Sequence, residues 1–386
     1  MADLTQSMYL TVVKGDEKLP TCSRCERSGR WCDRTAPLKI QPQKNVGRRT
    51  KGAKGTIEQF DEPRVSLQDE EIAHYFAHYL KTLAPWYDLD DLDQAFKSIV
   101  GSRAQQSSLL LSAIIAFAAI HKSRTSHDVP KLLPEKHHAH CLRLLIGLTE
   151  TAPAIKDGTA LAATCLLRSF EILAEEEDPN RHLFGAFSLI PSLSCSLPEE
   201  PLLRAGLWNY LREDITFSLI NRCPLKIEVG AIDIELHRDD NYANQITILL
   251  ARVINAVFAG GSDLLVGLQS AVSAWNSSIP FKPYHESHQD VFPKIQMVED
   301  CHVAARQYWH VAQILLGLNT GNTGDFEAHA RTICGMAFSA NSDPVVVNSY
   351  GPICYSAQWL SRDDARRELV NRLRIAKRGP VGPFNT

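Results

Sequence analysis

The stretch SLQDEEIAHYFAHYLKTL, residues 66 to 83, sets the class of fold that the chain can adopt. Its large apolar side chains recur at the period of an α-helix and share one face, namely Ile72, Tyr75, Phe76, Tyr79, Leu80 and Leu83. Ser66, with Asp69 three residues later, predicts a capping box at the helix start. We therefore predict one amphipathic helix with one buried face, which ends near Pro85.

Helical patterns continue from this stretch almost to the end of the chain. Three further start signals are Asp157 before TALAATCLLRSFEILAEE, Ser262 before DLLVGLQSAVSAW, and Ser361 with Asp364 before ARRELVNRLRIAK. The segment LKIEVGAIDIEL, residues 225 to 236, alternates at period two, which indicates either a short strand pair or an extended connection. The predicted fold is all-α, an irregular array of roughly a dozen helices.

The size and composition of the chain favour one large domain with an appendage. The sequence has 386 residues, of which 44% are hydrophobic and 22% are charged, as in a folded soluble protein. Ten scattered cysteines and an N-terminus without a secretory pattern lead us to expect a reducing, intracellular compartment. The apolar stretch SSLLLSAIIAFAAI, residues 107 to 120, is shorter than the ~20 residues of a bilayer span, so we predict a buried helix and no membrane partner.

Charge is distributed unevenly along the chain. Residues 18 to 54 contain eleven lysines and arginines against two acidic residues, although the whole chain has a net charge of -3. Such a basic arm on an acidic body is typical of contact with polyanions at one end. We predict a cysteine-containing segment at 1 to 34, a basic flexible linker at 35 to 65, and a helical domain at 66 to 386. Within the linker, KNVGRRTKGAKG could also serve as a nuclear import signal.

Three cysteines in the basic arm have the spacing of metal ligands. Cys22 and Cys25 are separated by two residues, and Cys32 follows six residues further on, within VKGDEKLPTCSRCERSGRWCDR at 13 to 34. A tight turn can direct the first two thiolates at one metal ion, and a short helix can return the third. The segment is too polar to bury free cysteines, so we predict a zinc site that lacks one ligand of a closed tetrahedral shell.

This arrangement resembles half of the DNA-binding module in fungal zinc binuclear-cluster (Zn2Cys6) transcription factors. CSRCERSGRWC is similar to the second of that module's two C-x2-C-x6-C half-motifs, and Lys14, Asp16 and Pro20 also match the family. Gly15 stands where the family has its third cysteine, and the residues before it match nothing in the family. The resemblance implies partial zinc ligation by Cys22, Cys25 and Cys32, with the first half of the cluster missing.

The missing half supplies, in the family, the helix that enters the major groove. The resemblance therefore implies that this chain contacts DNA weakly and with little sequence preference, mainly through backbone phosphates. We expect the phosphate contacts to come from basic residues of the arm, namely Lys18, Arg24, Arg48, Arg49 and Lys51. The resemblance also implies that the protein is located in the nucleus.

A second resemblance covers residues 67 to 378. Words such as HYFAHYLKTLAPWYDLDD, LLLSAIIAFAAIHKS, RHLFGAFSLI and WNYLREDITFSLINRCPLKI are similar, in this order, to the helical regulatory region of many such factors. The family ends this region with Trp-Pro, which GPVGPFNT replaces here. The resemblance implies an all-α domain that holds the protein active or inactive. It further implies a homodimer or a transcriptional partner protein, and a small-molecule effector.

Two rival interpretations concern enzymes and metals. The aspartates of DLDDLD, residues 88 to 93, could bind magnesium diphosphate in an all-α terpenoid-type synthase, with EEEDPN at 175 to 180 as the nearest second motif. Alternatively, they cap the start of a helix. HHAH at 137 to 140, next to Cys141, could bind a metal or could form a surface turn before a core cysteine.

No catalytic motif is found in the sequence, so we predict a transcriptional regulator and not an enzyme. A co-regulator that acts through its helical domain without binding DNA is the alternative.

Overall fold

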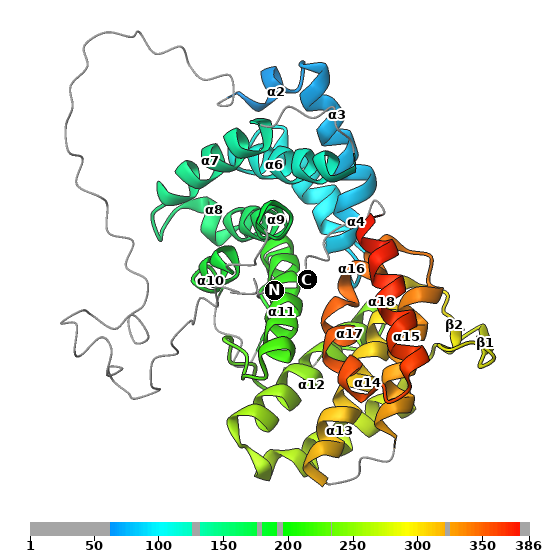
Figure 1. Cartoon of the computed structure of the whole chain (residues 1–386). Coiled ribbons are helices and arrows are strands. Elements are labelled where there is room, and N and C mark those ends of the chain that lie inside the picture. Colours follow the sequence, from blue (N-terminus) through cyan, green and yellow to red (C-terminus); the bar gives the residue numbers. More distant parts are fainter. Residues whose placement is uncertain are drawn as a thin grey trace, which may run out of the picture. The chain divides into compact units, whose positions relative to one another are not determined.

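The computed structural model describes residues 62–125, 132–175, 180–190, 196–232, 234–320 and 325–378. These residues form an irregular array of helices with one small β-hairpin at its side (Figure 1). The prediction of an all-α multi-helix array is therefore confirmed.

The first elements in chain order are α2 (Pro63–Ser66), α3 (Glu70–His78), the π-helical turn η2 (Tyr79–Leu83), α4 (Ala84–Tyr87), the π-helical turn η3 (Phe96–Val100), α5 (Gly101–Ala104), α6 (Ser108–Thr125), α7 (Leu133–Ile146), α8 (Pro153–Lys156), α9 (Thr159–Ala174), α10 (Arg181–Phe187) and α11 (Pro201–Asn221). The later elements are α12 (Asp239–Ala259), α13 (Ser262–Ser278), β1 (His285–Ser287), β2 (Lys294–Gln296), α14 (Asp300–Thr320), α15 (Phe326–Ser339), α16 (Asp343–Asn348), α17 (Tyr350–Ser356), the 3-10 turn η4 (Ala357–Trp359) and α18 (Asp363–Arg378).

Helix α6 is the centre of the first half of the array. Its residues from Leu109 to His121 are all buried, and α6 packs against α3, α7 and α9. A helix that is apolar on every side must be surrounded by other helices, which explains why α6 lacks a polar face. The apolar stretch around Leu110 is therefore a buried core helix, as the sequence predicts.

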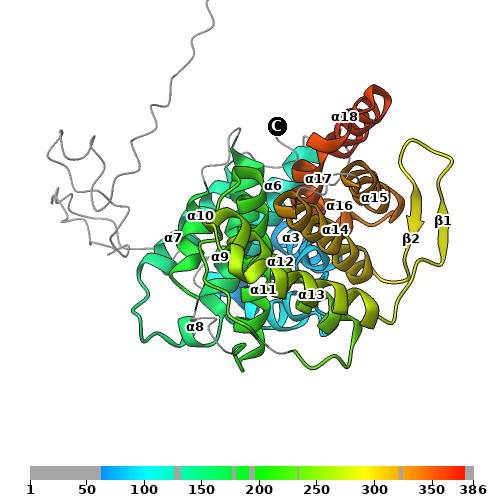
Figure 2. The same ribbon diagram turned by 90° about the horizontal axis from the view of Figure 1, so that it is seen from below.

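The second half of the array is built around α12 and α14, which pack along each other. Helices α13 and α15 cover this pair, and β2 lies against α15. Helix α18 projects from this part of the array (Figure 2) and contacts α15. Among the described helices, α12 is long and apolar enough to cross a membrane. The bent pair formed by Phe96–Ala104 and Ser108–Arg124 would also be long and apolar enough if its two helices are counted as one span. Because α12 packs between core helices and buries Asp240, Asn244 and Thr247, we interpret it as a core helix.

Helix α11 joins the two halves. It contacts α9 and α10 on one side and α12 and α17 on the other. Close approach to α17 depends on Gly351, where a Cβ atom would lie 2.6 Å from the Thr216 hydroxyl oxygen. The junction of the halves is therefore packed too tightly to accept a larger side chain at this position.

The start of the first long helix differs from the sequence-based prediction. Asp69 is the N-cap of α3, since its Oδ1 accepts hydrogen bonds from Glu71 N (2.9 Å) and Ile72 N (3.2 Å), whereas Ser66 ends the preceding α2. The helical path also continues past Pro85 to Tyr87. Pro85 is tolerated because it lies in the first turn of α4, directly after the widened turn η2.

The segment that alternates at period two is an extended connection with one isolated bridge at Val229, so the strand-pair alternative is wrong. The antiparallel pair β1 and β2, with Glu286 opposite Ile295, lies elsewhere and was not predicted. Its strands have three residues each, which is too short for a clear alternation of apolar and polar side chains.

Candidate functional site

The residues predicted to bind zinc and DNA lie outside the described residues. This applies to Cys22, Cys25 and Cys32 and to Lys18, Arg24, Arg48, Arg49 and Lys51. Their roles therefore stay predictions, and the candidate site described below lies in the helical array.

A cavity of about 330 Å³ lies between α9 and α11, and α14, α16 and α17 complete its wall. We call it the α9–α11 cavity and define it by its lining residues Arg168, Arg212, Glu213, Phe217, Ile220, Tyr308 and Val347. A smaller cavity of about 50 Å³ adjoins it and shares Arg168, Arg212, Glu213, Val347 and Asn348. The volume is at the lower end of the range for small-molecule sites in proteins.

Arg168 forms one side of the cavity. Only 8% of its side chain is exposed, and its guanidinium has acceptors from three segments. Nη1 donates to Glu171 Oε2 (3.3 Å), Nη2 donates to Asn180 Oδ1 (3.1 Å), and Nε donates to Glu213 Oε2 (3.4 Å). The three contacts hold the positive charge at the wall formed by α9, because a buried arginine needs several acceptors to offset its lost hydration.

Arg212 forms the opposite side, and 5% of its side chain is exposed. Its Nη1 lies 3.4 Å from Asp90 Oδ2, and its Nη2 donates to the carbonyl oxygen of Tyr87 and to Asn209 Oδ1, both at 3.1 Å. Its Nε is buried and has no hydrogen-bond partner in the described part of the chain. Burial raises the pKa of Asp90 to about 6, although the positive charge of Arg212 acts in the opposite direction.

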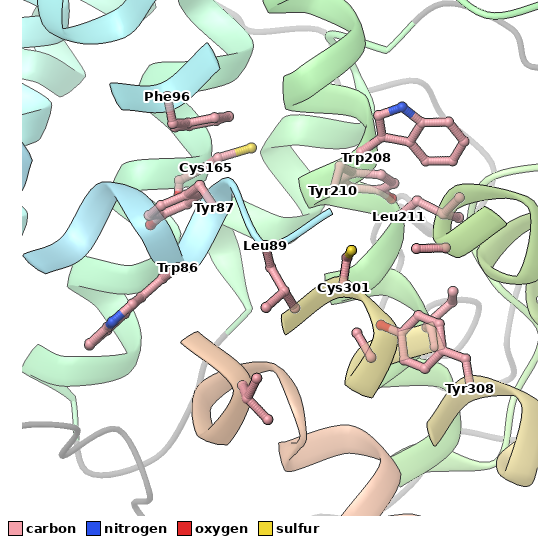
Figure 3. Packing of buried hydrophobic residues seen from close by; sticks show 14 of the residues in the cluster. Trp86, Tyr87, Leu89, Phe96, Cys165, Trp208, Tyr210, Leu211, Cys301 and Tyr308 are labelled. Atoms are coloured by element: carbon pink, nitrogen blue, oxygen red, sulfur yellow. The ribbon is translucent and has the colours of Figure 1, made fainter. Parts of the chain in front are cut away.

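Aromatic side chains surround this region from several helices. Figure 3 shows Tyr87 next to Phe96 and Cys165, with Tyr210 and Tyr308 on other helices of the same buried cluster. The Tyr87 ring stacks on Phe96 with 4.6 Å between ring centroids, and its hydroxyl lies 2.5 Å from Ser169 Oγ. Burial raises the pKa of Tyr308 above its usual value. The phenol is therefore neutral at physiological pH and can donate a hydrogen bond.

The DLDDLD segment connects α4 to η3. Asp88 accepts hydrogen bonds from Phe96 N (2.8 Å) and Lys97 N (3.0 Å), and Asp91 accepts from Asp93 N and Ala95 N, both at 3.0 Å. The capping interpretation is confirmed for these two aspartates.

The other two aspartates of the segment form ion pairs, Asp90 with Arg212 and Asp93 with Arg238. Since all four carboxylates bind backbone amides or arginines, the segment is not arranged like the metal-binding face of a synthase. Most of EEEDPN, residues 176 to 179, lies outside the described residues.

HHAH lies within α7 and is not a surface turn, so that part of the prediction is wrong. His137, His140 and Cys141 are buried, and His140 Nδ1 lies 2.9 Å from Ser112 Oγ. Within the described ranges, no group of three or more His, Cys, Asp and Glu side chains could hold a metal ion. Cys141 is the core cysteine that the alternative interpretation expected.

His138, on another face of α7, lies 3.2 Å from His182 between their Nε2 atoms. The pKa of His182 is lowered to about 4, first by burial and then by His138, Arg181 and Arg168, while Glu171 acts in the opposite direction. The pKa of this histidine is lower in the folded state than the value near 6.5 of an unfolded chain. Its contribution to stability is therefore fully present above about pH 6.5. That contribution is lost as the pH falls from 6.5 toward 4.

We expect His182→Gln to reduce the loss of thermal stability on acidification. Glutamine can still bond to His138 but cannot be protonated, so the drop in Tm between pH 7.5 and pH 5 should be smaller by about 2 °C. Thermal melts at both pH values measure the difference. His237→Gln is the matched control, because the His237 side chain is 77% exposed, and it should leave the drop unchanged. An equal drop in the His182 variant and the wild type would contradict the expectation.

Sequence reasoning missed the residues that line the cavity. The sequence did contain a signal. Arg168 and Arg212 each place a charge within the apolar sequence of a helix, α9 and α11, that is buried on nearly all sides. A charged residue within such a helix must find a buried partner or line a cavity. The partner itself could not be predicted, since Arg168 and Glu213 are 45 residues apart and Arg212 and Asp90 are 122 apart.

Part of the described array matches a known family. Residues 72–220 match the family model for the fungal specific transcription factor domain. The match runs from α3 to the end of α11 and includes both arginines of the α9–α11 cavity. The resemblance of the helical region is therefore confirmed over this segment, which is less than half of the chain. No curated protein and no solved structure gave a significant match.

Proposed function

We propose that the chain is a fungal transcriptional regulator whose helical body responds to an effector and whose basic arm contacts DNA in the nucleus. The observation that carries this proposal is the match of residues 72–220 to the fungal specific transcription factor domain. The basic residues and the cysteines of the arm support the DNA-binding part of the proposal from sequence alone.

The proposed mechanism assigns separate tasks to the two ends of the chain. The arm neutralises phosphates with Arg48, Arg49 and Lys51 and has little means of reading bases. Partial zinc ligation by Cys22, Cys25 and Cys32 orders the arm weakly, because a cluster of this type needs six thiolates. The helical body supplies the regulated surface, and the α9–α11 cavity is the part of it that can bind a small molecule.

We expect the triple substitution Arg48→Gln, Arg49→Gln and Lys51→Gln to weaken binding of the full chain to duplex DNA. Each phosphate contact that is lost should make the slope of log affinity against log salt less negative by about 0.9, so the variant should lose up to about 2.7. Electrophoretic or fluorescence titrations with a random-sequence duplex at several salt concentrations measure the slope.

The matched control removes three lysines from exposed positions on the helical body, Lys81, Lys97 and Lys136, and should leave the slope unchanged. Elemental analysis of the same wild-type preparation should find fewer than two zinc ions per chain. Equal slopes for the arm variant and the wild type would favour the alternative, a co-regulator that acts through the helical body without binding DNA.

A further inference from the structure

We infer that the α9–α11 cavity binds a small amphipathic organic anion, with its anionic head beside Arg168 and Arg212 and its apolar part along Phe217, Ile220 and Val347. The regulatory meaning of this binding rests on the proposed function, whereas the binding itself is a property of the cavity.

Two arginines on facing helices supply the positive charge. The side chains of Arg168 and Arg212 are each at least nine-tenths buried, and both line the cavity. Water screens charges poorly at such positions, so an anion is attracted more strongly there than at the protein surface. The Nε atom of Arg212 has no partner within the described residues but is fully buried, so Arg212 attracts an anion by its charge and not by a bond from this atom.

Glu213 is the group that an entering anion can replace. Its carboxylate lies 3.4 Å from Arg168 Nε, a long contact, and 40% of its side chain is exposed. By contrast, the side chain of Glu171, the other carboxylate on Arg168, is 1% exposed. Glu213 can therefore rotate into water at little cost, while Glu171 keeps Arg168 in place.

The rest of the wall is apolar or carries a neutral donor. Ile220 has 46% of its surface exposed near the end of α11, and Phe217 and Val347 are partly buried beside it. The Tyr308 hydroxyl forms no hydrogen bond within the described ranges and can donate one to a ligand oxygen. A cavity of about 330 Å³ with this lining suits a medium-chain carboxylate.

A cationic ligand fits the cavity poorly. The carboxylates that line it are Glu213 and Glu175, and Glu175 Oε1 lies 2.5 Å from Arg181 Nη2. An ammonium group would have to compete with Arg168 for Glu213 and with Arg181 for Glu175, which are already paired. The carboxylate of an anionic ligand can instead take the place of Glu213 on Arg168.

The test titrates the full chain with three probes of equal length and different heads, octanoate, 1-octanol and octylammonium, by calorimetry and thermal melts at one ionic strength. Octanoate should bind and raise Tm, since a ligand of the native state stabilises it by mass action. 1-Octanol should bind at least about tenfold more weakly because it lacks the charge-assisted bonds. Octylammonium should not raise Tm.

Two variants locate the site. Glu213→Gln frees Arg168 from a competing charge and should tighten octanoate binding several-fold, while Ile220→Asp should weaken it by a similar factor. Glu199→Gln, which removes an exposed carboxylate elsewhere, should change nothing. Melting curves without ligand verify that each variant folds, as expected for exposed or partly exposed positions.

Equal binding of all three probes, or no response to Glu213→Gln, would overturn the inference. Loss of octanoate binding with intact binding of the chain to DNA would sink the inference and leave the proposed function standing. Octanoate binding in a chain that neither binds DNA nor affects transcription would sink the proposed function instead.

Discussion

Arg212→Met should lower the free energy of unfolding by about 3–5 kcal/mol, because it removes one partner of a buried ion pair and leaves the other charge in place. The side chain of Asp90 is 1% exposed and lies 3.4 Å from Arg212 Nη1. The substitution also deprives the Tyr87 carbonyl oxygen and Asn209 of a donor. Chemical denaturation of the full chain, monitored by circular dichroism, measures the change.

The matched control is Arg252→Met. Arg252 lies on α12, is partly exposed, and forms no ion pair or side-chain hydrogen bond within the described residues. Its replacement should change stability by less than about 0.5 kcal/mol. A loss below 1 kcal/mol for Arg212→Met would show that the buried pair is not a stabilising element.

The Arg212→Met variant should recover stability when the pH is lowered. Asp90 has a pKa of about 6, raised by burial and lowered by Arg212, so loss of the arginine should raise the pKa further. A carboxyl group whose folded pKa exceeds the unfolded value stabilises the fold as it is protonated. The difference between variant and wild type should therefore shrink from pH 8 to pH 5.

Gly158→Ala should cost about 3 kcal/mol or more. Gly158 has φ of 79° at the start of α9, in the left-handed region that disfavours alanine by about 1–2 kcal/mol. A Cβ atom would also lie 2.3 Å from Leu203 N, a backbone atom of α11 that cannot move away cheaply. Forced displacement of packed elements adds about 1–3 kcal/mol. Urea denaturation of the full chain measures the loss.

Gly260→Ala separates the two causes. Gly260 has φ of 82° at the end of α12, and nothing lies within 4 Å of the position of its Cβ atom. Its substitution should carry the backbone cost alone, about 1–2 kcal/mol. Equal destabilisation of the two alanine variants would show that the close approach of α9 to α11 adds nothing to the cost of a side chain at position 158.

The helices could be predicted from sequence because their signals are local. Ser262 is the first residue of α13, and Asp157 accepts a hydrogen bond from Thr159 N at the start of α9 (3.0 Å). Caps and apolar periodicity act within one or two turns, so they can be read from a short window of sequence. The N-cap of α3 was misplaced because Ser66 and Asp69 are both good N-cap residues, and Ser66 lies instead in the last turn of the short helix α2.

The candidate site could not be predicted in the same way. Arg168, Arg212 and Tyr308 lie on three helices and meet only when the array is assembled. Each residue could be recognised as an unusual polar group in an apolar pattern, but nothing in a short window states which distant residue it faces. The cavity also exists only because the surrounding side chains leave this space empty. That outcome depends on how several helices pack together.

The hydrogen bonds that hold the end of α4 join residues far apart in the chain. Asn209 and Asn348 donate to the carbonyl oxygens of Tyr87 and Trp86, 122 and 262 residues earlier. A ribosome that adds ~5–20 residues per second needs on the order of 10 s or more to supply the second partner. During that interval the end of α4 lacks a partner for the carbonyl oxygen of Trp86, so truncations that remove Asn348 should destabilise the first half of the array although they leave it whole.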